Sequence, residues 1–169
     1  MRVINIYSYI ILNEKPNLYK EYCLGWKFQI ITGSVIFNYE YLKGKKLFNE
    51  NLIRSQEAEF FSRIFFQEDY IFKVVNTPTF LYRQHKSTKS NKNKKYLNEF
   101  KESETFVFLE NFKRSVLLKD KELTNYYYKL LTRYFFRGLE NNHFRNSKRI
   151  FKETIEKISN EAKTSGQTL

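Results

Sequence analysis

The sequence is poor in cysteine and contains no long apolar run. Its 169 residues include one cysteine, Cys23, which excludes an internal disulfide and leaves no second thiolate for a metal site. A lone thiol is typical of a reducing compartment and more often packs in a core than acts as a nucleophile. No segment approaches the roughly 20 apolar residues that span a bilayer. These absences favour a cytoplasmic protein without a membrane span.

The first residues lack the features of a secretory signal. Residues 3–12 are the most apolar part of the N-terminus, yet Asn5 and Ser8 interrupt them and no small-residue cleavage site follows. The segment instead predicts a strand or a short buried helix. Pro16 predicts a turn after it.

Acidic residues are missing from one stretch of an otherwise mixed chain. The net charge is +12, and half of this excess lies between Arg83 and Lys95, where six Lys or Arg occur with no Asp or Glu. Such a patch is able to bind nucleic acid, an anionic membrane surface or a pyrophosphate group. A solvated loop without a partner is the alternative. Nucleic acid is disfavoured, because the aromatic residues fall at helical core spacing and no known nucleic-acid motif occurs.

Aromatic residues are abundant, with 17 Phe and 13 Tyr, and one segment arranges them as a helical face. Residues 55–66 predict an amphipathic helix, because four large apolar side chains recur at helical spacing: Phe60, Phe61, Ile64 and Phe65. Glu57 lies in the first turn of this helix. A carboxylate there either complements the helix dipole or points into a cleft.

Short apolar runs flank this helix. Residues 70–75 and 79–82 predict strands on either side of a turn at Asn76-Thr77-Pro78. Residues 28–32 form a further apolar run that ends in Thr32-Gly33-Ser34. Because a glycine there weakens a strand, Gly33 predicts a bulge or a close backbone approach.

The periodicity from Lys94 onward is helical and predicts about three helices. Their apolar stripes are Phe106, Leu109, Phe112 and Val116; then Leu123, Tyr127, Leu130 and Tyr134; then Phe151, Ile155 and Ile158. Gly138 and Asn141-Asn142 are predicted to end the second helix, and Ser147 to cap the third. The fold class predicted is α/β: short strands and one amphipathic helix over residues 1–95, with a helical region over residues 96–169 packed on them.

Four motifs occur in order within roughly residues 29–90. They read TGSVIF from Thr32, FNENL from Phe48, RSQEAEFFSR from Arg54, and NTP from Asn76 followed by Tyr82-Arg83. Their order and spacing resemble the C-terminal half of family 2 glycosyltransferases with the GT-A fold. The resemblance implies an inverting enzyme that transfers a sugar from a nucleotide-sugar donor to an acceptor hydroxyl, in surface or capsular polysaccharide synthesis.

The resemblance also implies roles for single residues. Glu57, preceded by Gln56 and followed by Arg63, stands where the family has its general base, usually an aspartate. Thr32 and Gly33 would lie beside the donor sugar or the acceptor. The residues implied to border the nucleotide pyrophosphate are Tyr82, Arg83 and His85.

Acceptors of this family include polyprenyl diphosphates, so the resemblance implies peripheral attachment at the inner face of the membrane. We expect the contacts to an anionic lipid surface to come from Lys86, Lys89, Lys92, Lys94 and Lys95.

The nucleotide-binding half of the family is missing from this sequence. No Asp-x-Asp motif occurs, although the full-length family uses one to hold Mg²⁺ or Mn²⁺ on the pyrophosphate. The nearest acidic pair, Glu68-Asp69, falls in a predicted turn. We therefore expect a truncated glycosyltransferase that holds no metal and is inactive alone.

Each implied site residue has a structural alternative. Glu57 could be an ordinary acid of a first helical turn, and Arg63 could form an ion pair with Glu59, whose replacement is expected to be milder than that of Glu57. His85 could be a surface histidine and Tyr82 a core residue. For the whole chain, the alternatives are a basic nucleic-acid-binding protein and a non-catalytic scaffold that docks to a polysaccharide-assembly enzyme.

Overall fold

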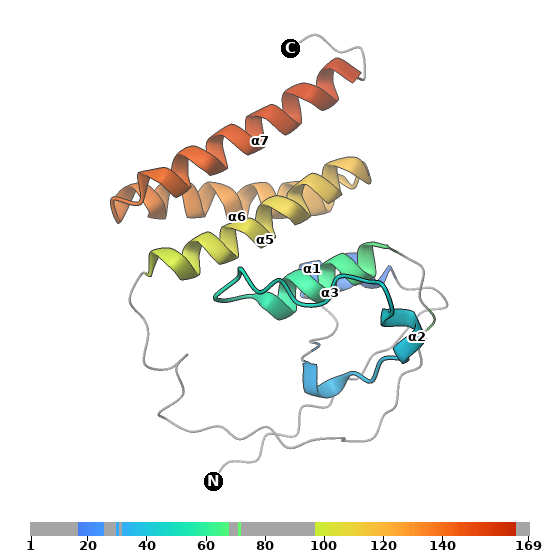
Figure 1. The fold of residues 1–169 in the computed structure, drawn as a ribbon. Coiled ribbons are helices and arrows are strands. Elements are labelled where there is room, and N and C mark those ends of the chain that lie inside the picture. The colour runs from blue at the N-terminus through green and yellow to red at the C-terminus, as the bar shows by residue number, and fades with distance from the viewer. Residues whose placement is uncertain (1–16, 26–29, 31, 68–70, 72–96, 165–169) are drawn as a thin grey trace. The chain divides into compact units, whose positions relative to one another are not determined.

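The structure is a computed structural model that describes residues 17–25, 30, 32–67, 71 and 97–164, with side chains up to residue 160. Its elements are helical (Figure 1): α1 Leu18–Leu24, a 3-10 helix η1 Thr32–Ser34, α2 Tyr39–Leu42, α3 Gln56–Phe66, α5 Asn98–Leu117, α6 Lys121–Glu140 and α7 Phe144–Thr164. The chain divides into two compact units. The first unit is Met1–Asn49 with Glu57–Tyr96, and the second unit is Glu50–Gln56 with Leu97–Leu169.

The α/β fold predicted from the sequence is wrong, because the described residues form helices and contain no strand. Where Gly33 predicted a bulge in a strand, Thr32–Ser34 form a single 3-10 turn, closed by the Val35 N–H donating to the Thr32 carbonyl at 3.5 Å. A turn of this kind satisfies its own backbone locally and needs no neighbouring strand. The predicted segments 3–12 and 79–82, and all of 70–75 except Ile71, lie outside the described residues.

Helix α1 has a start and a stop that its sequence explains. The Asn17 side chain accepts a hydrogen bond from the Lys20 N–H at 2.8 Å, which satisfies one of the free donors of the first turn. Gly25 closes the helix at φ 67°, a left-handed conformation that glycine adopts without steric cost. The helix buries Leu18, Tyr19, Cys23 and Leu24. Cys23 is thus a core residue, which agrees with the interpretation of the lone thiol.

The core of the first unit is a cluster of aromatic rings around α3. The predicted apolar face of this helix is confirmed, since Phe60, Phe61, Ile64 and Phe65 are all buried. The Phe61 ring lies 5.9 Å from the Tyr22 ring of α1 and 6.2 Å from the Phe37 ring, measured between centroids. Edge and tilted contacts of this kind stabilise beyond the burial of area alone.

Helices α5, α6 and α7 form the second unit, in the part of the chain where three helices were predicted, and each packs on the other two (Figure 1). Asp120 begins α6, because its carboxylate accepts from the N–H groups of Glu122 at 3.0 Å and Leu123 at 3.1 Å. The apolar core of the unit is small and mostly aliphatic: Leu52, Val107, Leu109, Phe112, Leu123, Tyr127, Leu131 and Ile150.

Asn141 caps the C-terminus of α6, as predicted. Two other predicted helix ends, at Gly138 and at Ser147, are wrong, and close packing of α6 on α7 explains both. Gly138 lies inside α6, where an added Cβ would come 2.3 Å from the Ser147 Oγ. Ser147 lies inside α7 rather than at its cap, and its buried hydroxyl donates to the Phe135 carbonyl at 2.9 Å. Glycine and serine are common at helix ends, but here their small size lets two helices approach.

The predicted core stripe of the third helix is also wrong. Phe151, Ile155 and Ile158 are 60%, 49% and 37% exposed. The buried face of α7 is mainly polar and consists of Asn146, Ser147, Ile150 and Thr154. Side-chain hydrogen bonds make that burial tolerable: the Asn146 Nδ2 donates to the Thr105 Oγ1 of α5 at 2.9 Å.

Candidate functional site

The structure brings together two predicted site residues that lie 25 positions apart in the chain. The Thr32 N–H donates a hydrogen bond to the Glu57 Oε1 at 2.9 Å, and the Thr32 hydroxyl donates to the same oxygen. Both residues belong to the first unit, and both side chains are exposed. This pair is the centre of the candidate site.

Local structure explains why the pair forms. Thr32 is the first residue of η1, so its N–H has no partner within that turn. Glu57 lies in the first turn of α3, directly after Gln56, and its side chain projects from the exposed side of the helix. A carboxylate is a strong acceptor for such an unpaired N–H. The bond therefore fixes the direction of the Glu57 side chain.

The second carboxylate oxygen of Glu57 belongs to an exposed side chain. Both bonds from Thr32 reach Oε1, and no hydrogen bond within the described part of the chain reaches Oε2. An ionised carboxylate held by one oxygen and open at the other is a suitable proton acceptor for a bound hydroxyl group.

Tyr22 is a neighbour of Glu57 that the sequence did not reveal. Burial raises the pKa of the Tyr22 phenol, and the charges of Cys23 and Glu57 raise it further, so the phenol stays neutral. Its ring lies 5.5 Å from the Phe65 ring, between centroids. A tyrosine in a helix of 7 residues carries no motif that predicts this neighbour, so only tertiary packing places Tyr22 here.

Arg63 is engaged in structural bonds. Its Nε lies 2.7 Å from the Glu59 Oε1, and its two terminal nitrogens donate to the carbonyls of Lys46 and Leu47, each at 2.6 Å. The side chains of Glu59 and Arg63 are only 7% and 15% exposed. The ion-pair alternative for Arg63 is therefore confirmed, and the arginine ties the segment before α3 to the helix.

Gln56 is described and is the exposed first residue of α3, but three predicted site residues lie outside the described part of the chain. They are Tyr82, Arg83 and His85, together with the acidic pair Glu68-Asp69 and the basic run from Lys86 to Lys95. Gly33 is described, and it lies next to Thr32 in η1 on the exposed surface. The described side chains contain no group of three or more His, Cys, Asp or Glu that could hold a metal ion. Nor does any helix in the described ranges combine the length and apolar character needed to cross a bilayer.

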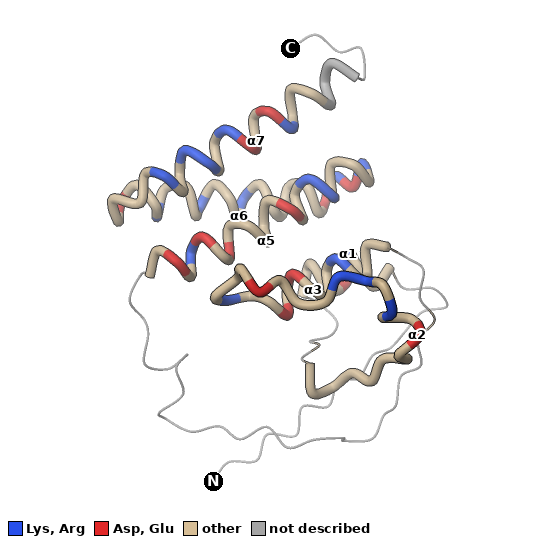
Figure 2. Tube along the Cα trace, viewed as in Figure 1, with Lys and Arg blue, Asp and Glu red and all other residues tan. Residues whose placement is uncertain are grey.

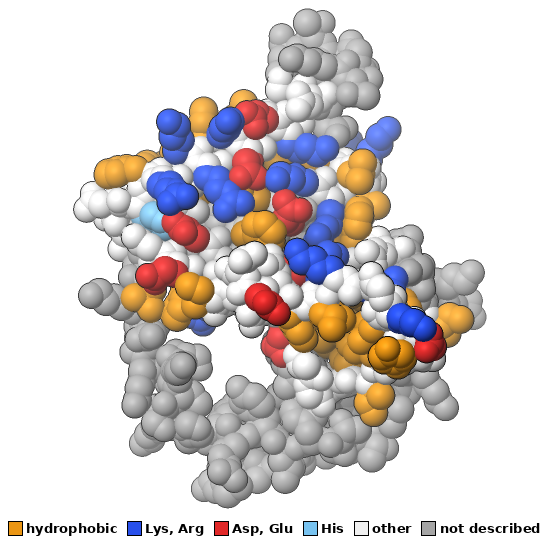
Figure 3. Space-filling model, in the orientation of Figure 1, with side chains coloured by type: hydrophobic (Ala, Val, Ile, Leu, Met, Phe, Trp, Pro, Cys, Tyr) orange, Lys and Arg blue, Asp and Glu red, His pale blue; other side chains and the backbone are white. Residues whose placement is uncertain are grey.

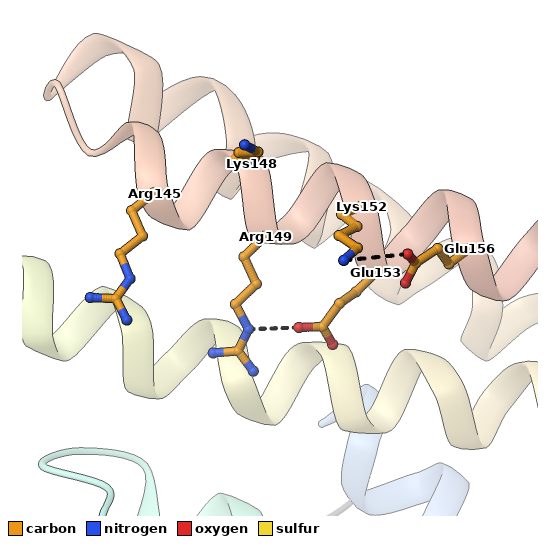
Figure 4. A pocket seen from close by; sticks show the side chains of 6 residues that line it. All are labelled: Arg145, Lys148, Arg149, Lys152, Glu153 and Glu156. Carbon is orange, nitrogen blue, oxygen red and sulfur yellow. Dashed lines mark hydrogen bonds and ion pairs between the residues drawn. The ribbon is translucent and has the colours of Figure 1, made fainter.

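A shallow hollow with a basic lining lies on α7. It is lined by Arg145, Lys148, Arg149, Lys152, Glu153 and Glu156 (Figure 4). Two ion pairs neutralise part of the lining, with the Arg149 Nε 2.7 Å from the Glu153 Oε1 and the Lys152 Nζ 3.7 Å from the Glu156 Oε1. The hollow is open and offers no proton acceptor beyond these paired carboxylates.

Glu153 also links α7 to α5. The Lys113 Nζ lies 2.7 Å from its Oε2. Partial burial alone would raise the pKa of Glu153, but hydrogen bonds from Lys113 and Arg149 lower it below the ordinary value. At Lys113, burial alone would lower the pKa, but its hydrogen bonds to Glu153 and Glu110 raise the pKa above the ordinary value. The cluster is thus an interhelical ion-pair network.

Comparison of the chain with protein-family models, with curated proteins and with solved structures finds no match.

Proposed function

We propose that this chain carries the acceptor-activating part of a glycosyltransferase of the family 2 type, with Glu57 as the general base. The observation that carries the proposal is the hydrogen-bonded pair of Thr32 and Glu57. The two residues come from separate motifs of the resemblance, and the folded chain places them in contact. We assign the acceptor hydroxyl to the Oε2 of this exposed side chain.

The chemistry proposed for the pair is a single displacement. The acceptor hydroxyl donates a hydrogen bond to the Glu57 Oε2, and its oxygen attacks the anomeric carbon of the nucleotide sugar. The bond between that carbon and the diphosphate oxygen breaks, so the nucleoside diphosphate leaves with the bonding electrons and the sugar is inverted. The hydroxyl proton passes to Glu57, while Thr32 holds the other oxygen in place.

The donor side of the reaction is assigned to other groups. The sequence has no Asp-x-Asp motif, and the described residues contain no ligand set for Mg²⁺ or Mn²⁺. Arg83 and His85 are the residues that the resemblance implies at the pyrophosphate. A polyprenyl-diphosphate or polysaccharide acceptor would place the enzyme at the cytoplasmic face of a membrane.

The decisive test replaces Glu57 in a chain joined to a donor-binding half that carries Asp-x-Asp. Glu57→Gln keeps the shape and removes the basic oxygen, so turnover should fall by roughly 10² to 10⁴ while donor affinity stays the same. Glu57→Asp should retain measurable activity. Product formation and nucleoside diphosphate release are measured for each variant.

Glu40→Gln is the matched control, because Glu40 is another exposed first-turn glutamate of the same unit. It should leave turnover unchanged. A Glu57→Gln enzyme that transfers sugar at the parent rate, with unchanged stability, would show that Glu57 is an ordinary first-turn acid.

A companion experiment tests whether the donor nucleotide sugar is bound by groups outside this chain. The chain by itself is titrated with nucleotide sugars by calorimetry, with and without Mg²⁺ or Mn²⁺. We expect weak binding or none, and no transfer. Micromolar, metal-dependent binding would contradict the assignment of the donor site to groups outside this chain.

The scaffold alternative has one observation in its favour. The Glu57 carboxylate satisfies the free N–H at the start of η1, which is a purely structural role. Under this alternative, replacing Glu57 by a residue without an acceptor would lower stability and change no rate, and Thr32→Val, which keeps the N–H, would have the smaller effect. A salt titration with single-stranded RNA and with a nucleotide sugar distinguishes nucleic-acid binding from both the transferase and the scaffold hypotheses.

A further inference from the structure

Helices α6 and α7 expose a set of large apolar side chains, here called the α6/α7 apolar strip. Its members are Phe136, Leu139, Phe144, Phe151, Ile155 and Ile158, whose exposed fractions are 56%, 38%, 59%, 60%, 49% and 37%. Single exposed apolar residues are normal on a protein surface, but a contiguous set marks an interaction site.

Helical spacing shows that the strip is contiguous. On α7, Phe151, Ile155 and Ile158 recur every three or four residues, and Phe144 lies two turns before Phe151. The two helices meet along this strip, because the Phe135 and Phe151 rings lie 6.5 Å apart between centroids. The close approach at Gly138 and Ser147 brings the two apolar sets onto one surface.

Basic side chains border the strip on both helices. Lys129 and Arg133 of α6 are exposed, and Arg133 lies one turn before Phe136. On α7, Lys148 lies one turn from both Phe144 and Phe151, and Lys152, which pairs with the exposed Glu156 at 3.7 Å, lies one turn before Ile155; both lysines are exposed. Figure 2 shows how Lys and Arg recur along α7, and Figure 3 shows them gathered over α7 and α5 on the face in view.

The start of α7 is free of negative charge. Between Asn141 and Lys152 the chain has four Lys or Arg and no Asp or Glu. An apolar strip with basic borders fits the boundary between headgroups and acyl chains of an anionic bilayer, since aromatic rings enter the boundary and cations meet the lipid phosphates.

We propose that the α6/α7 apolar strip docks this chain on an anionic lipid bilayer, with both helices lying in the plane of the membrane surface. A second copy of the chain fits less well. Two such faces would bring the basic borders of one copy against those of the other, and like charges at an apolar contact are unfavourable. The strip shares no residue with the basic run between Lys86 and Lys95, and the proposal does not depend on sugar transfer.

The test uses the full chain with phosphatidylcholine vesicles that either contain or lack phosphatidylglycerol. Co-sedimentation should show binding to the anionic vesicles only. The double variant Phe136→Ser/Phe151→Ser and the double variant Lys148→Glu/Lys152→Glu should each lower the partition coefficient by about tenfold or more. Circular dichroism melts confirm that each variant remains folded.

Two control variants separate this surface from its competitors. Leu117→Ser removes another exposed apolar side chain from the second unit, where Leu117 is 62% exposed, and should bind like the parent. The variant in which Lys86, Lys89, Lys92, Lys94 and Lys95 are all serine should still bind the anionic vesicles, because the strip is intact, and complete loss of binding would assign the contact to the basic run alone.

A spectroscopic readout reports insertion directly. In a Trp26→Phe background, which removes the only tryptophan, Phe151→Trp should show a blue-shifted emission on anionic vesicles and quenching by lipids labelled in the acyl chain. Absence of parent binding to anionic vesicles would overturn the proposal. Unchanged vesicle binding of both double variants would overturn it as well. A third contrary result would be that the chain forms a dimer, and that Phe136→Ser/Phe151→Ser dissociates this dimer but leaves vesicle binding unchanged.

Discussion

The two units of this chain bury different kinds of side chain. The first unit packs aromatic rings, with Phe60 and Phe61 of α3 against Phe37 and the rings of α1. The second unit buries aliphatic side chains together with a polar seam that includes Thr105, Asn146 and Ser147. Helix length accounts for the difference. Helices of 7 and 11 residues offer few contacts each, so large rings are needed, whereas α6 and α7, with 20 and 21 residues, can pack closely through small side chains.

The ion pairs of the two units differ in how far they are buried. Glu59 and Arg63 are paired at 7% and 15% exposure, while Lys113 and Glu153 are paired at 37% and 22%. A buried pair that loses one partner leaves an uncompensated charge, but an exposed pair is solvated again by water. Sensitivity to mutation should therefore be concentrated in the first unit. Four predictions test this comparison.

The largest effect is expected from the aromatic core. Phe61 is fully buried, so Phe61→Ala should lower the free energy of unfolding by about 3–5 kcal/mol. Denaturant unfolding measures the total, and peptide-resolved hydrogen exchange shows which unit opens. Phe136→Ala, at a 56% exposed position, should change stability by less than about 0.5 kcal/mol. If Phe61→Ala and Phe136→Ala lowered the free energy of unfolding equally, the aromatic rings around α3 would not be the main source of stability in the first unit.

The buried ion pair comes next. Glu59→Ala strands the Arg63 guanidinium at 15% exposure, and we expect a loss of about 3 kcal/mol in unfolding free energy. Lys113→Ala in the second unit should cost less than about 1 kcal/mol. For stability, Glu59 is thus the more sensitive of the two first-turn acids, although Glu57 was expected to matter more for catalysis. If Glu59→Ala lowered the free energy of unfolding by less than Lys113→Ala does, the comparison between the two units would be reversed.

The close approach in the second unit predicts a smaller, coupled effect. Gly138→Ala places a Cβ against the Ser147 Oγ, and the resulting strain should cost about 1–3 kcal/mol. Ser147→Ala removes that oxygen, so the double variant should be less destabilised than the sum of the single variants. Thermal melts of the four proteins measure the coupling. Strict additivity would mean that α6 and α7 shift apart without strain.

The smallest effect concerns pH. The pKa of Glu153 is lowered in the folded chain, so its ion pairs stabilise the fold above the ordinary value of 4.5 and lose this contribution as pH falls below that value. Glu153→Gln should therefore be less stable than the parent at neutral pH, by less than about 1 kcal/mol, and the two should converge in acid. A constant difference across this range would exclude the ion pairs as its source.

Local sequence was sufficient for some elements. The face of α3 was visible from four apolar residues at helical spacing, and their burial confirms it. The ion pair of Glu59 with Arg63 was also foreseeable, because residues four apart are neighbours on a helix. Both rest on interactions within one helix, which periodicity encodes directly.

The pairing of Thr32 with Glu57 and the presence of Tyr22 beside them required the tertiary structure. The sequence assigned Thr32 to the end of a strand-like run. In the structure Thr32 begins a 3-10 turn, so its N–H has no partner within the turn and donates to Glu57 instead. A glycine or serine has the same local signature whether it ends a helix or lets two helices touch, so Gly138 and Ser147 were misplaced.

The sequence by itself determined where α3 begins, which side of it is apolar, and that long helices follow. Only the tertiary structure decided which face of α7 is buried. Hydrogen bonds such as that from Asn146 to Thr105 allow the polar face of α7 to pack inward, and the apolar stripe of Phe151, Ile155 and Ile158 is left exposed. Periodicity reports that a helix has two faces. It does not report which of them finds partners, because that depends on groups contributed by other helices.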